Sequence, residues 1–300
     1  MATQQRNRSR RPSSSRARGP RHVEAVLDPT WQNPYAPSAN ERDGHREAVR
    51  RFALRRKRPQ LVLVGVIVVA LLAATVVSPL FAVAGVAMIA AQVYDLRRSL
   101  TRGERRGETL GAEILAAFSP GGSSKDRQRL VTVLDRLTAT FGVDGVSAFI
   151  VADEGYNAAL APNGAGYSLF VTSALMRDFE LIELEGVVAH CLARQRLGVL
   201  GRESAAATLN APVGVRRELA GAGLTYRCDE VAAAVIRYPL GLAGALRKCS
   251  RQVVPPNSFF ASASYDQWRF IWFDVYSDRG TPDLSDLDDV ELRALALEEW

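Results

Sequence analysis

An uninterrupted apolar stretch of about thirty residues, from Leu61 to Ala91, contains no charged side chain. An α-helix needs only about 20 apolar residues to cross a hydrocarbon core that is about 30 Å thick. The stretch begins after about sixty residues and is too long for the apolar region of a secretory signal. The sequence therefore predicts a membrane-spanning segment within residues 59–95, and the lipid bilayer is the first expected partner.

Pro79 divides this apolar stretch near its middle. Proline lacks a backbone donor and disfavours helical conformation at the residue before it, here Ser78. Two helices, Leu61–Val77 and Leu80–Tyr94, would be near the lower length limit for a span. One straight helix would be about 46 Å long and would need a strong tilt or exposed ends. A helical hairpin is the favoured interpretation, and a single span remains the alternative.

Basic residues crowd both flanks of the stretch. They are Arg50, Arg51, Arg55, Arg56, Lys57 and Arg58 before it, and Arg97, Arg98, Arg102, Arg105 and Arg106 after it. Positive flanks favour the cytoplasmic side of a membrane, which supports the hairpin. Arginine also outnumbers lysine by roughly ten to one, which is typical of high-GC bacterial genomes. The expected location is the bacterial inner (cell) membrane, with the soluble domain in the cytoplasm.

The first 58 residues hold fifteen Arg and Lys residues against five acidic ones. The segment Arg6–Arg21 has too few apolar side chains to offset the entropy lost on ordering, so residues 1–58 are expected to be a disordered basic tail. No aromatic interleaving or folded basic face accompanies this charge, which argues against nucleic acid as a partner. At the other end of the chain, residues 283–299 are strongly acidic.

Apolar spacing after the membrane segment is mainly helical. Helices are expected over Glu108–Phe118, over Lys125–Phe141 with Ser124 as its cap, and over residues 179–197, 213–237 and 239–250. Short strands are expected over Val146–Val151 and Ser168–Thr172, joined by a Gly/Asn/Pro-rich loop. The fold class is therefore α+β, mainly α, with a small sheet. Residues 96–255 are expected to form one soluble domain, and residues 256–300 an aromatic and then acidic extension.

The helix expected over residues 179–197 contains the run Val187-Val188-Ala189-His190-Cys191-Leu192-Ala193-Arg194. This run has the frame of an H-E-x-x-H motif, in which two histidines on one helical face bind zinc and the glutamate is the general base. His190 stands at the first histidine position. Cys191 stands at the position of the base and Arg194 at the position of the second histidine, so two of the three chemical residues are replaced.

Further segments surround this helix in a fixed order. They are Val146–Val151, Tyr156-Asn157-Ala158-Ala159, Ser168–Leu175 and Glu180–Gly186 upstream, and Cys228–Ala234 and Tyr238–Lys248 downstream. In this order they resemble the membrane-anchored gluzincin peptidases of the HtpX type, including the CAAX prenyl protease branch. The resemblance covers roughly residues 108–250 and the membrane segment. It implies an N-terminal membrane hairpin followed by a gluzincin-like zinc metallopeptidase domain.

The resemblance also implies roles for single positions. The first zinc ligand, the general base, the second ligand and the third ligand of the family fall in turn on His190, Cys191, Arg194 and Thr225. Three further family positions are retained, namely Asp229, Asn157 and Thr172. One ligand of three remains and the base is lost. The expected protein is therefore a pseudoenzyme, and no residue is assigned as catalytic.

No cofactor is expected, although zinc would be the cofactor if the family activity were retained. The chain has three histidines, and His22 and His45 both precede the membrane segment. Catalytic zinc needs several ligands and an open coordination position, and the fixed positive charge of Arg194 would oppose the ion. The resemblance also implies that the helix of Arg194 faces the helix of Thr225 and Asp229. Because a buried guanidinium needs a partner, Arg194 is expected to contact Asp229, directly or through a water, with His190 close by.

The favoured function is protein binding or regulation, with a peptide partner paired along an edge strand that ends near Thr172. One alternative is an active enzyme with a rewired site. Its metal version would use His190, Cys191, Cys228 and Asp229 as ligands, and its thiol version would use Cys191 as the nucleophile. Neighbouring helix positions diverge by about 100°, so His190 is poorly placed to be the base for Cys191. A further alternative is a structural membrane scaffold.

Overall fold

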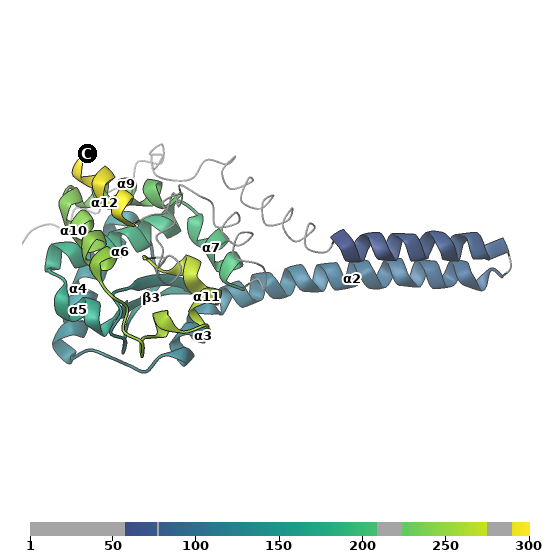
Figure 1. Ribbon diagram of the computed structural model, residues 1–300, viewed down its shortest axis with the longest axis horizontal. Helices are drawn as coiled ribbons and strands as arrows, with labels where there is room; N and C mark the ends of the chain where they lie inside the picture. Colours follow the sequence, from purple (N-terminus) through teal and green to yellow (C-terminus); the bar gives the residue numbers. More distant parts are fainter. Residues whose placement is uncertain (1–57, 77, 209–223, 275–289) are drawn as a thin grey trace, which may run out of the picture. The chain divides into compact units, whose positions relative to one another are not determined.

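The computed structural model describes residues 58–76, 78–208, 224–274 and 290–300 (Figure 1). The basic tail expected over residues 1–58 lies outside this part, apart from its last residue. The first residues of the helix expected over 213–237 and the beginning of the acidic segment lie outside it as well. The described chain is mainly helical and contains one small sheet, which agrees with the α+β, mainly α class.

The described elements follow one another in this order: a helix over residues 58–73, η1 (Ala74–Val76), α2 (Leu80–Glu108), α3 (Leu110–Ala117), α4 (Ser124–Phe141), β1 (Val146–Val151), β2 (Ala158–Asn163), β3 (Gly166–Thr172), α5 (Ser173–Asp178), α6 (Leu181–Arg196), α7 (Val199–Thr208), α9 (Leu224–Ile236), α10 (Pro239–Arg251), η2 (Phe259–Ala261), α11 (Tyr265–Trp268), η3 (Arg269–Ile271) and α12 (Val290–Glu298). Helix α7 was not predicted. Helix α2 runs to Glu108, past the end expected at Tyr94.

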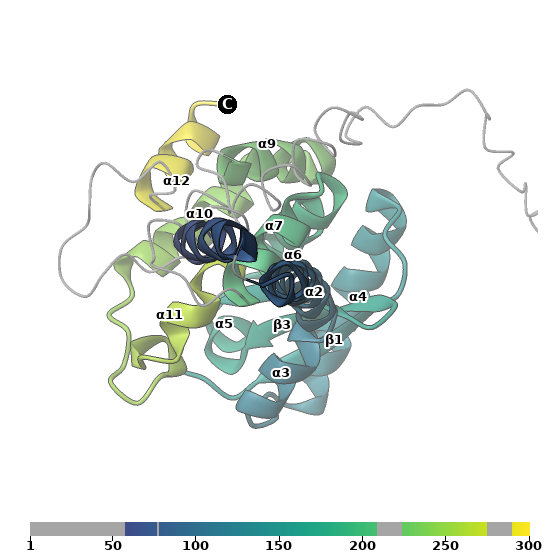
Figure 2. The ribbon, with the colours of Figure 1, turned by 90° about the vertical axis from the view of Figure 1, so that its right-hand side faces the viewer.

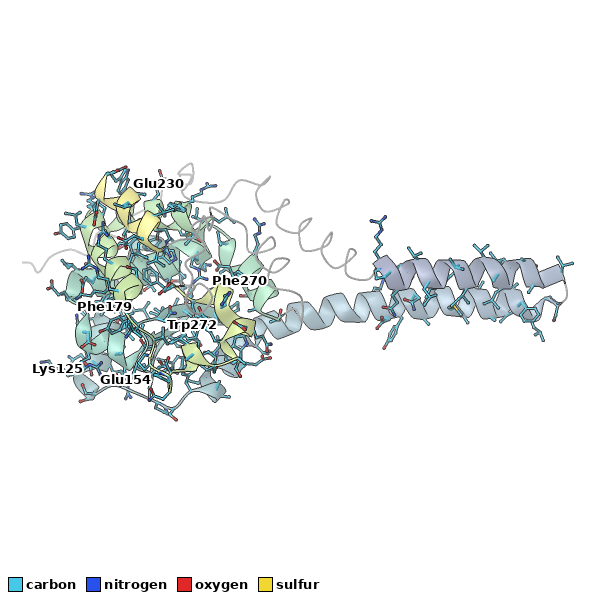
Figure 3. The ribbon with its side chains drawn as sticks, in the orientation of Figure 1. Lys125, Glu154, Phe179, Glu230, Phe270 and Trp272 are labelled. Atoms are coloured by element: carbon cyan, nitrogen blue, oxygen red, sulfur yellow. The ribbon has the colours of Figure 1, made fainter. Side chains whose placement is uncertain are left out.

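The helix Arg58–Val76 is the one described helix that is long and apolar enough, by length and composition, to cross a membrane. The apolar part of the following helix, Leu80–Asp95, is shorter. Helix α2 begins directly after Pro79, where proline is expected to interrupt a helix. The side chains of both segments stand away from the ribbon (Figure 3), and Val62, Val66 and Val69 are between 59% and 67% exposed.

Helix α4 begins with a capping box. The Ser123 side chain accepts a hydrogen bond from the Asp126 backbone N–H, and the Asp126 carboxylate accepts one from the Ser123 backbone N–H at 2.8 Å. This reciprocal pair satisfies two backbone donors that the first turn leaves free. The expected cap, Ser124, is instead the first helical residue. Ser123 and Ser124 are both possible caps. Ser123 is the cap because Asp126, three residues later, completes the capping box.

The three strands lie in the order β1-β3-β2, with β1 parallel and β2 antiparallel to β3. The expectation that the strand ending near Thr172 is an edge strand is wrong. Strand β3 is central, and at its end Thr172 pairs with Val151 on one side while its N–H donates to the Asn157 carbonyl on the other. A strand that is paired on both sides has no free backbone groups for an added peptide strand.

Strand β2 was expected to be part of a loop. Three of its six residues are alanine, a fourth is Pro162 and the last is Asn163, and these residue types are rare in strands. These residues form a strand because their side chains are buried, and alternate side chains enter two different cores. Ala158 and Leu160 lie in the core with α6, whereas Ala159 and Ala161 lie in the core with Trp272. The sheet is therefore covered on both faces, where small side chains suffice.

Helix α6 is buried on almost every side, and it contacts α4, α9, α10 and β2 (Figure 2). A helix that is apolar all round needs neighbours all round. Close approach of α10 depends on Gly186, since a Cβ at this position would lie 2.8 Å from the Leu242 Cα. This tight crossing fixes the helix that carries His190, Cys191 and Arg194.

The C-terminal residues complete both cores. Phe273, Ala294 and Leu297 belong to the core around α6, and Trp272 belongs to the core on the other face of the sheet. The Phe273 N–H donates to the Ala158 carbonyl at 2.7 Å, so this segment continues the hydrogen bonding of the sheet beyond β2. The described residues that were expected as an extension are thus packed into the same body as residues 96–255.

Candidate functional site

Helices α6 and α9 lie against each other and bring most of the predicted site residues together (Figure 2). His190, Cys191 and Arg194 come from α6, while Cys228 and Asp229 come from α9, and all five are buried. Thr225 also lies on α9, one turn before Asp229, and is half-buried. The pairing of these two helices, which the resemblance implied, is present in the structure.

His190 and Asp229 form a direct hydrogen bond, with 2.6 Å between the His190 Nδ1 and the Asp229 Oδ1. Burial lowers the pKa of His190 to about 4, although Asp229 opposes this shift. Burial alone would raise the pKa of Asp229, but Arg293 and His190 outweigh it and hold that pKa at about 2. At neutral pH the histidine is therefore neutral and donates through Nδ1 to an ionised carboxylate.

Arg293 of α12 is the second partner of Asp229, and no sequence pattern had assigned it to the site. Its Nε donates to Oδ2 at 2.7 Å and its Nη2 to Oδ1 at 2.9 Å, which makes a bidentate pair. Its Nη1 donates to the Phe273 carbonyl, and the guanidinium carbon lies 5.2 Å from the centre of the Phe273 ring. The same ring meets the His190 ring edge-on.

The direct contact expected between Arg194 and Asp229 is not formed, because the guanidinium of Arg194 has other partners. Its Nε and Nη2 donate to Glu203 of α7, at 2.8 and 2.6 Å from Oε2. The remaining donors reach the carbonyls of Ile271 and Phe270 at 2.6 and 2.9 Å. The buried guanidinium does pair with a carboxylate, as expected from the cost of burying an unpaired charge. The partner was missed because α7 and its Glu203 were not predicted.

The three thiols are buried and poorly suited to nucleophilic chemistry. Burial raises the pKa of Cys191 to about 12 and the pKa values of Cys228 and Cys249 well above the usual range. The nucleophile is the thiolate, so at neutral pH almost none is present. These surroundings disfavour the thiol hydrolase alternative and agree with cysteines that pack as small apolar residues.

We expect all three cysteines to resist alkylation by iodoacetamide near pH 7.5 in the folded chain and to react fully after denaturation. The physical reasons are their burial and their raised pKa values. Mass spectrometry of the alkylated peptides measures each site separately. Rapid modification of Cys191 or Cys228 in the folded chain would contradict the prediction and would revive a reactive thiol.

The described residues contain no group of three or more His, Cys, Asp or Glu side chains arranged to hold a metal ion. Around His190, the carboxylates that could bind a metal ion are already engaged by other residues. His190 uses Nδ1 on Asp229, both Asp229 oxygens are engaged by Arg293, and Glu203 is engaged by Arg194. Asp229 and Glu203 are thus each paired with a guanidinium. The donor set present does not fit a gluzincin zinc ion.

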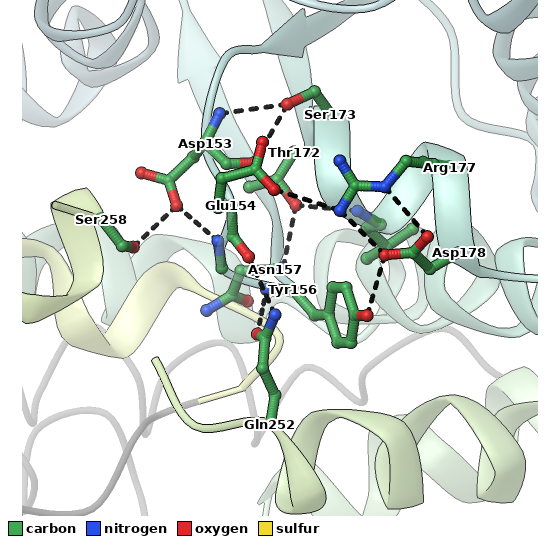
Figure 4. Close-up of polar contacts among 12 residues, drawn as sticks. Asp153, Glu154, Tyr156, Asn157, Thr172, Ser173, Arg177, Asp178, Gln252 and Ser258 are labelled. Carbon is green, nitrogen blue, oxygen red and sulfur yellow. Dashed lines mark hydrogen bonds and ion pairs between the residues drawn. The ribbon is translucent and has the colours of Figure 1, made fainter. Parts of the chain in front are cut away.

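Asn157 and Thr172, the other retained positions, have structural hydrogen bonds. Asn157 clamps the backbone of Asp274, donating to its carbonyl at 2.9 Å and accepting from its N–H at 3.0 Å. The Thr172 hydroxyl accepts from the Asn157 N–H and from the Leu175 N–H, which caps α5 (Figure 4). Asn157 therefore fixes the residue beside Phe273, whose carbonyl and ring contact Arg293.

The same region carries a wider polar network at the carboxyl ends of β1 and β3 (Figure 4). The Asp153 carboxylate accepts from the Gly155 N–H, the Ser258 hydroxyl and the Phe259 N–H. These bonds tie the C-terminal segment to the loop after β1. The network is satisfied by the chain itself and serves to position that segment.

No protein-family model matches the chain, and a search of curated proteins finds no match. The family resemblance carried by the α6 motif and its neighbours thus stays a hypothesis.

Stability is expected to fall as the pH is lowered from about 6.5 to about 4. The folded pKa of His190 is about 4, whereas an unfolded histidine titrates near 6.5, so the unfolded state binds the proton first. The contribution is complete above pH 6.5 and is lost as the pH falls to 4, on the order of 3 kcal/mol. Below about pH 4, protonation of Asp229 adds a further loss.

Denaturant midpoints of the full chain in detergent at pH 4.5, 5.5, 6.5 and 7.5 measure this dependence. The matched control is His190→Asn, which keeps a donor near Nδ1 and removes the titrating ring. Its midpoint should change less over the same interval than that of the parent. A variant with the same pH dependence as the parent would assign the effect to other groups.

Proposed function

We propose that the chain is a membrane-anchored, catalytically inactive relative of the HtpX-type zinc metallopeptidases that acts as a protein-binding or regulatory module. The observation that carries this proposal is Arg194. It stands one helical turn after His190, at the position of the second zinc ligand in the resembled family, and it is fully paired with Glu203 and two backbone carbonyls. A fixed positive charge at the position of a zinc ligand would oppose a metal ion.

Peptide hydrolysis by a gluzincin requires a metal-bound water and a base beside it. In this chain the position of the base carries Cys191, a neutral and buried thiol that cannot take a proton from water. His190 is held by Asp229, and the charge of Asp229 is offset by Arg293. Among the described residues of this site, the charged side chains stabilise one another, which is consistent with a site that does not catalyse hydrolysis.

The membrane anchor is part of the proposal. The helix Arg58–Val76 is long and apolar enough to cross a membrane, and most of its apolar side chains are exposed. The apolar segment Leu80–Asp95 follows after the break at Ser78-Pro79. Together with the basic flanks, these features favour a membrane hairpin with both ends in the bacterial cytoplasm, and a cytoplasmic domain behind it.

The function is tested by a peptidase assay on the full chain in detergent, with unfolded casein as substrate and with added zinc. We expect no cleavage above the level of the His190→Ala variant prepared in the same way. Cleavage that is lost in His190→Ala and also lost after treatment with a chelator would overturn the proposal, because it would show that His190 supports a metal-dependent reaction.

A further inference from the structure

The last described helix, α12, lies on α10 and α9 (Figures 1 and 2). We use the term α12 seat for the residues that hold it, namely Asp229, Arg247, Ser250 and Phe273. At the centre of the contact, the Arg293 guanidinium is 1% exposed and makes its bidentate pair with Asp229. The seat thus encloses a complete binding site for one guanidinium.

Apolar contacts and polar contacts of α12 surround that guanidinium. Ala294 and Leu297 place apolar side chains in the core, at 0% and 4% exposure. At the rim, Arg247 pairs with Glu298 at 2.6 Å and also with Glu291, and the Ser250 hydroxyl donates to Glu291 at 3.0 Å. A helix of nine residues is too short to be stable alone in water, so α12 depends on this docking.

We propose that the α12 seat is a recognition site for an arginine-bearing amphipathic helix of a partner protein, and that α12 occupies this site within the same chain until such a helix displaces it. The proposal deepens the binding role proposed above and rests on it. It assigns the place of binding to α9 and α10, since the strand ending at Thr172 is paired on both sides.

Charge complementarity identifies the occupant. Asp229 is an ionised carboxylate buried beside a neutral histidine, so any helix that replaces α12 must supply a cation to avoid leaving a buried charge unpaired. The planar guanidinium matches the two carboxylate oxygens, the Phe273 carbonyl and the Phe273 ring together. A lysine is a single point donor and cannot make this set of contacts.

The positions of the contacting residues along α12 indicate the sequence pattern that a partner helix needs in order to bind the α12 seat. The central arginine is followed at the next position by a small residue and four positions later by leucine, as Arg293, Ala294 and Leu297 show. Acidic residues stand two positions before and five positions after the arginine, where they meet Arg247. Because α12 is tethered to the seat, a partner must overcome its high effective concentration, which sets a threshold for binding.

The test uses a fluorescent synthetic peptide of residues 286–300 and the full chain in detergent micelles. In the Leu297→Ala chain, the internal α12 is weakened while every ion pair of the seat is kept. We expect the peptide to bind this chain at least tenfold more tightly than it binds the parent. The matched control is Leu295→Ala, which alters a leucine that is 41% exposed on the same helix and should behave as the parent does.

A second peptide with Arg293→Gln tests the guanidinium and should bind the Leu297→Ala chain at least tenfold more weakly than the first peptide. Equal binding of the two peptides, or equal binding by the Leu297→Ala and Leu295→Ala chains, would overturn the proposal. The milder Leu297→Val chain is used if Leu297→Ala does not fold. Zinc bound by the parent chain would overturn the proposed function separately, so the two failures are distinguishable.

Discussion

Replacing Arg194 with alanine is expected to destabilise the folded chain by about 3–5 kcal/mol, because it removes the guanidinium that offsets the buried Glu203 carboxylate and frees two backbone carbonyls. Denaturant unfolding of the full chain in detergent, followed by tryptophan fluorescence, measures the change, since Trp272 is fully buried in the core. The matched control is Arg127→Ala on the exposed face of α4, which should change stability by less than about 0.5 kcal/mol.

The double variant Arg194→Met, Glu203→Leu separates the buried charge from the packing. Both partners become apolar side chains of comparable size, so most of the lost stability should return. A single variant with a loss below about 1 kcal/mol would contradict the buried ion pair. A double variant as unstable as Arg194→Ala would show instead that the carbonyl hydrogen bonds dominate.

Replacing Asp229 with alanine is the second change with a large expected effect, again about 3–5 kcal/mol. It removes the shared acceptor of His190 and Arg293, and it leaves the Arg293 guanidinium without its carboxylate. Arg293 can regain water only if α12 leaves its seat, so the variant should also lose its C-terminal residues to limited proteolysis first. Glu230→Ala, an exposed neighbour on the same helix, is the control and should match the parent.

An Asp229→Ala chain that unfolds at the parental midpoint and keeps α12 protected would contradict the role given to this carboxylate. The same experiment bears on the α12 seat, because it tests whether the buried ion pair, and not apolar packing alone, holds the helix. The effect is separable from the contribution of His190, since His190→Asn keeps Asp229 and Arg293 paired.

The sequence predicted the elements that have strong local patterns. The β-branched and aromatic run Val146–Val151 forms β1, the apolar run around His190 forms α6, and Pro239 begins α10. Strand β2 has no such local pattern. Its small residues form a strand because they pack closely on both faces of the sheet, which the sequence does not reveal. The central position of β3 depends on β2 and was missed with it.

The candidate site was predicted in part. The motif frame placed His190, Cys191 and Arg194 on one helix, and the resemblance placed that helix opposite the helix of Asp229. The direct hydrogen bond between His190 and Asp229 was not predicted. Glu203 was missed together with helix α7, and Arg293 was missed because an ion pair between distant segments leaves no periodic pattern in a sequence. A weak sign existed for Arg293, which is the only basic residue within residues 280–300. A lone arginine in an acidic segment suggests a specific carboxylate partner elsewhere in the fold.

The central claim is that the site of this chain is held together by its own guanidinium–carboxylate pairs and holds no catalytic metal. The most direct test is the metal content of the purified full chain after equilibration with zinc and removal of free ions, measured by elemental analysis for the parent and for His190→Ala. The account predicts far less than one zinc ion per chain in both proteins. One zinc ion per parent chain that is lost in His190→Ala would contradict it.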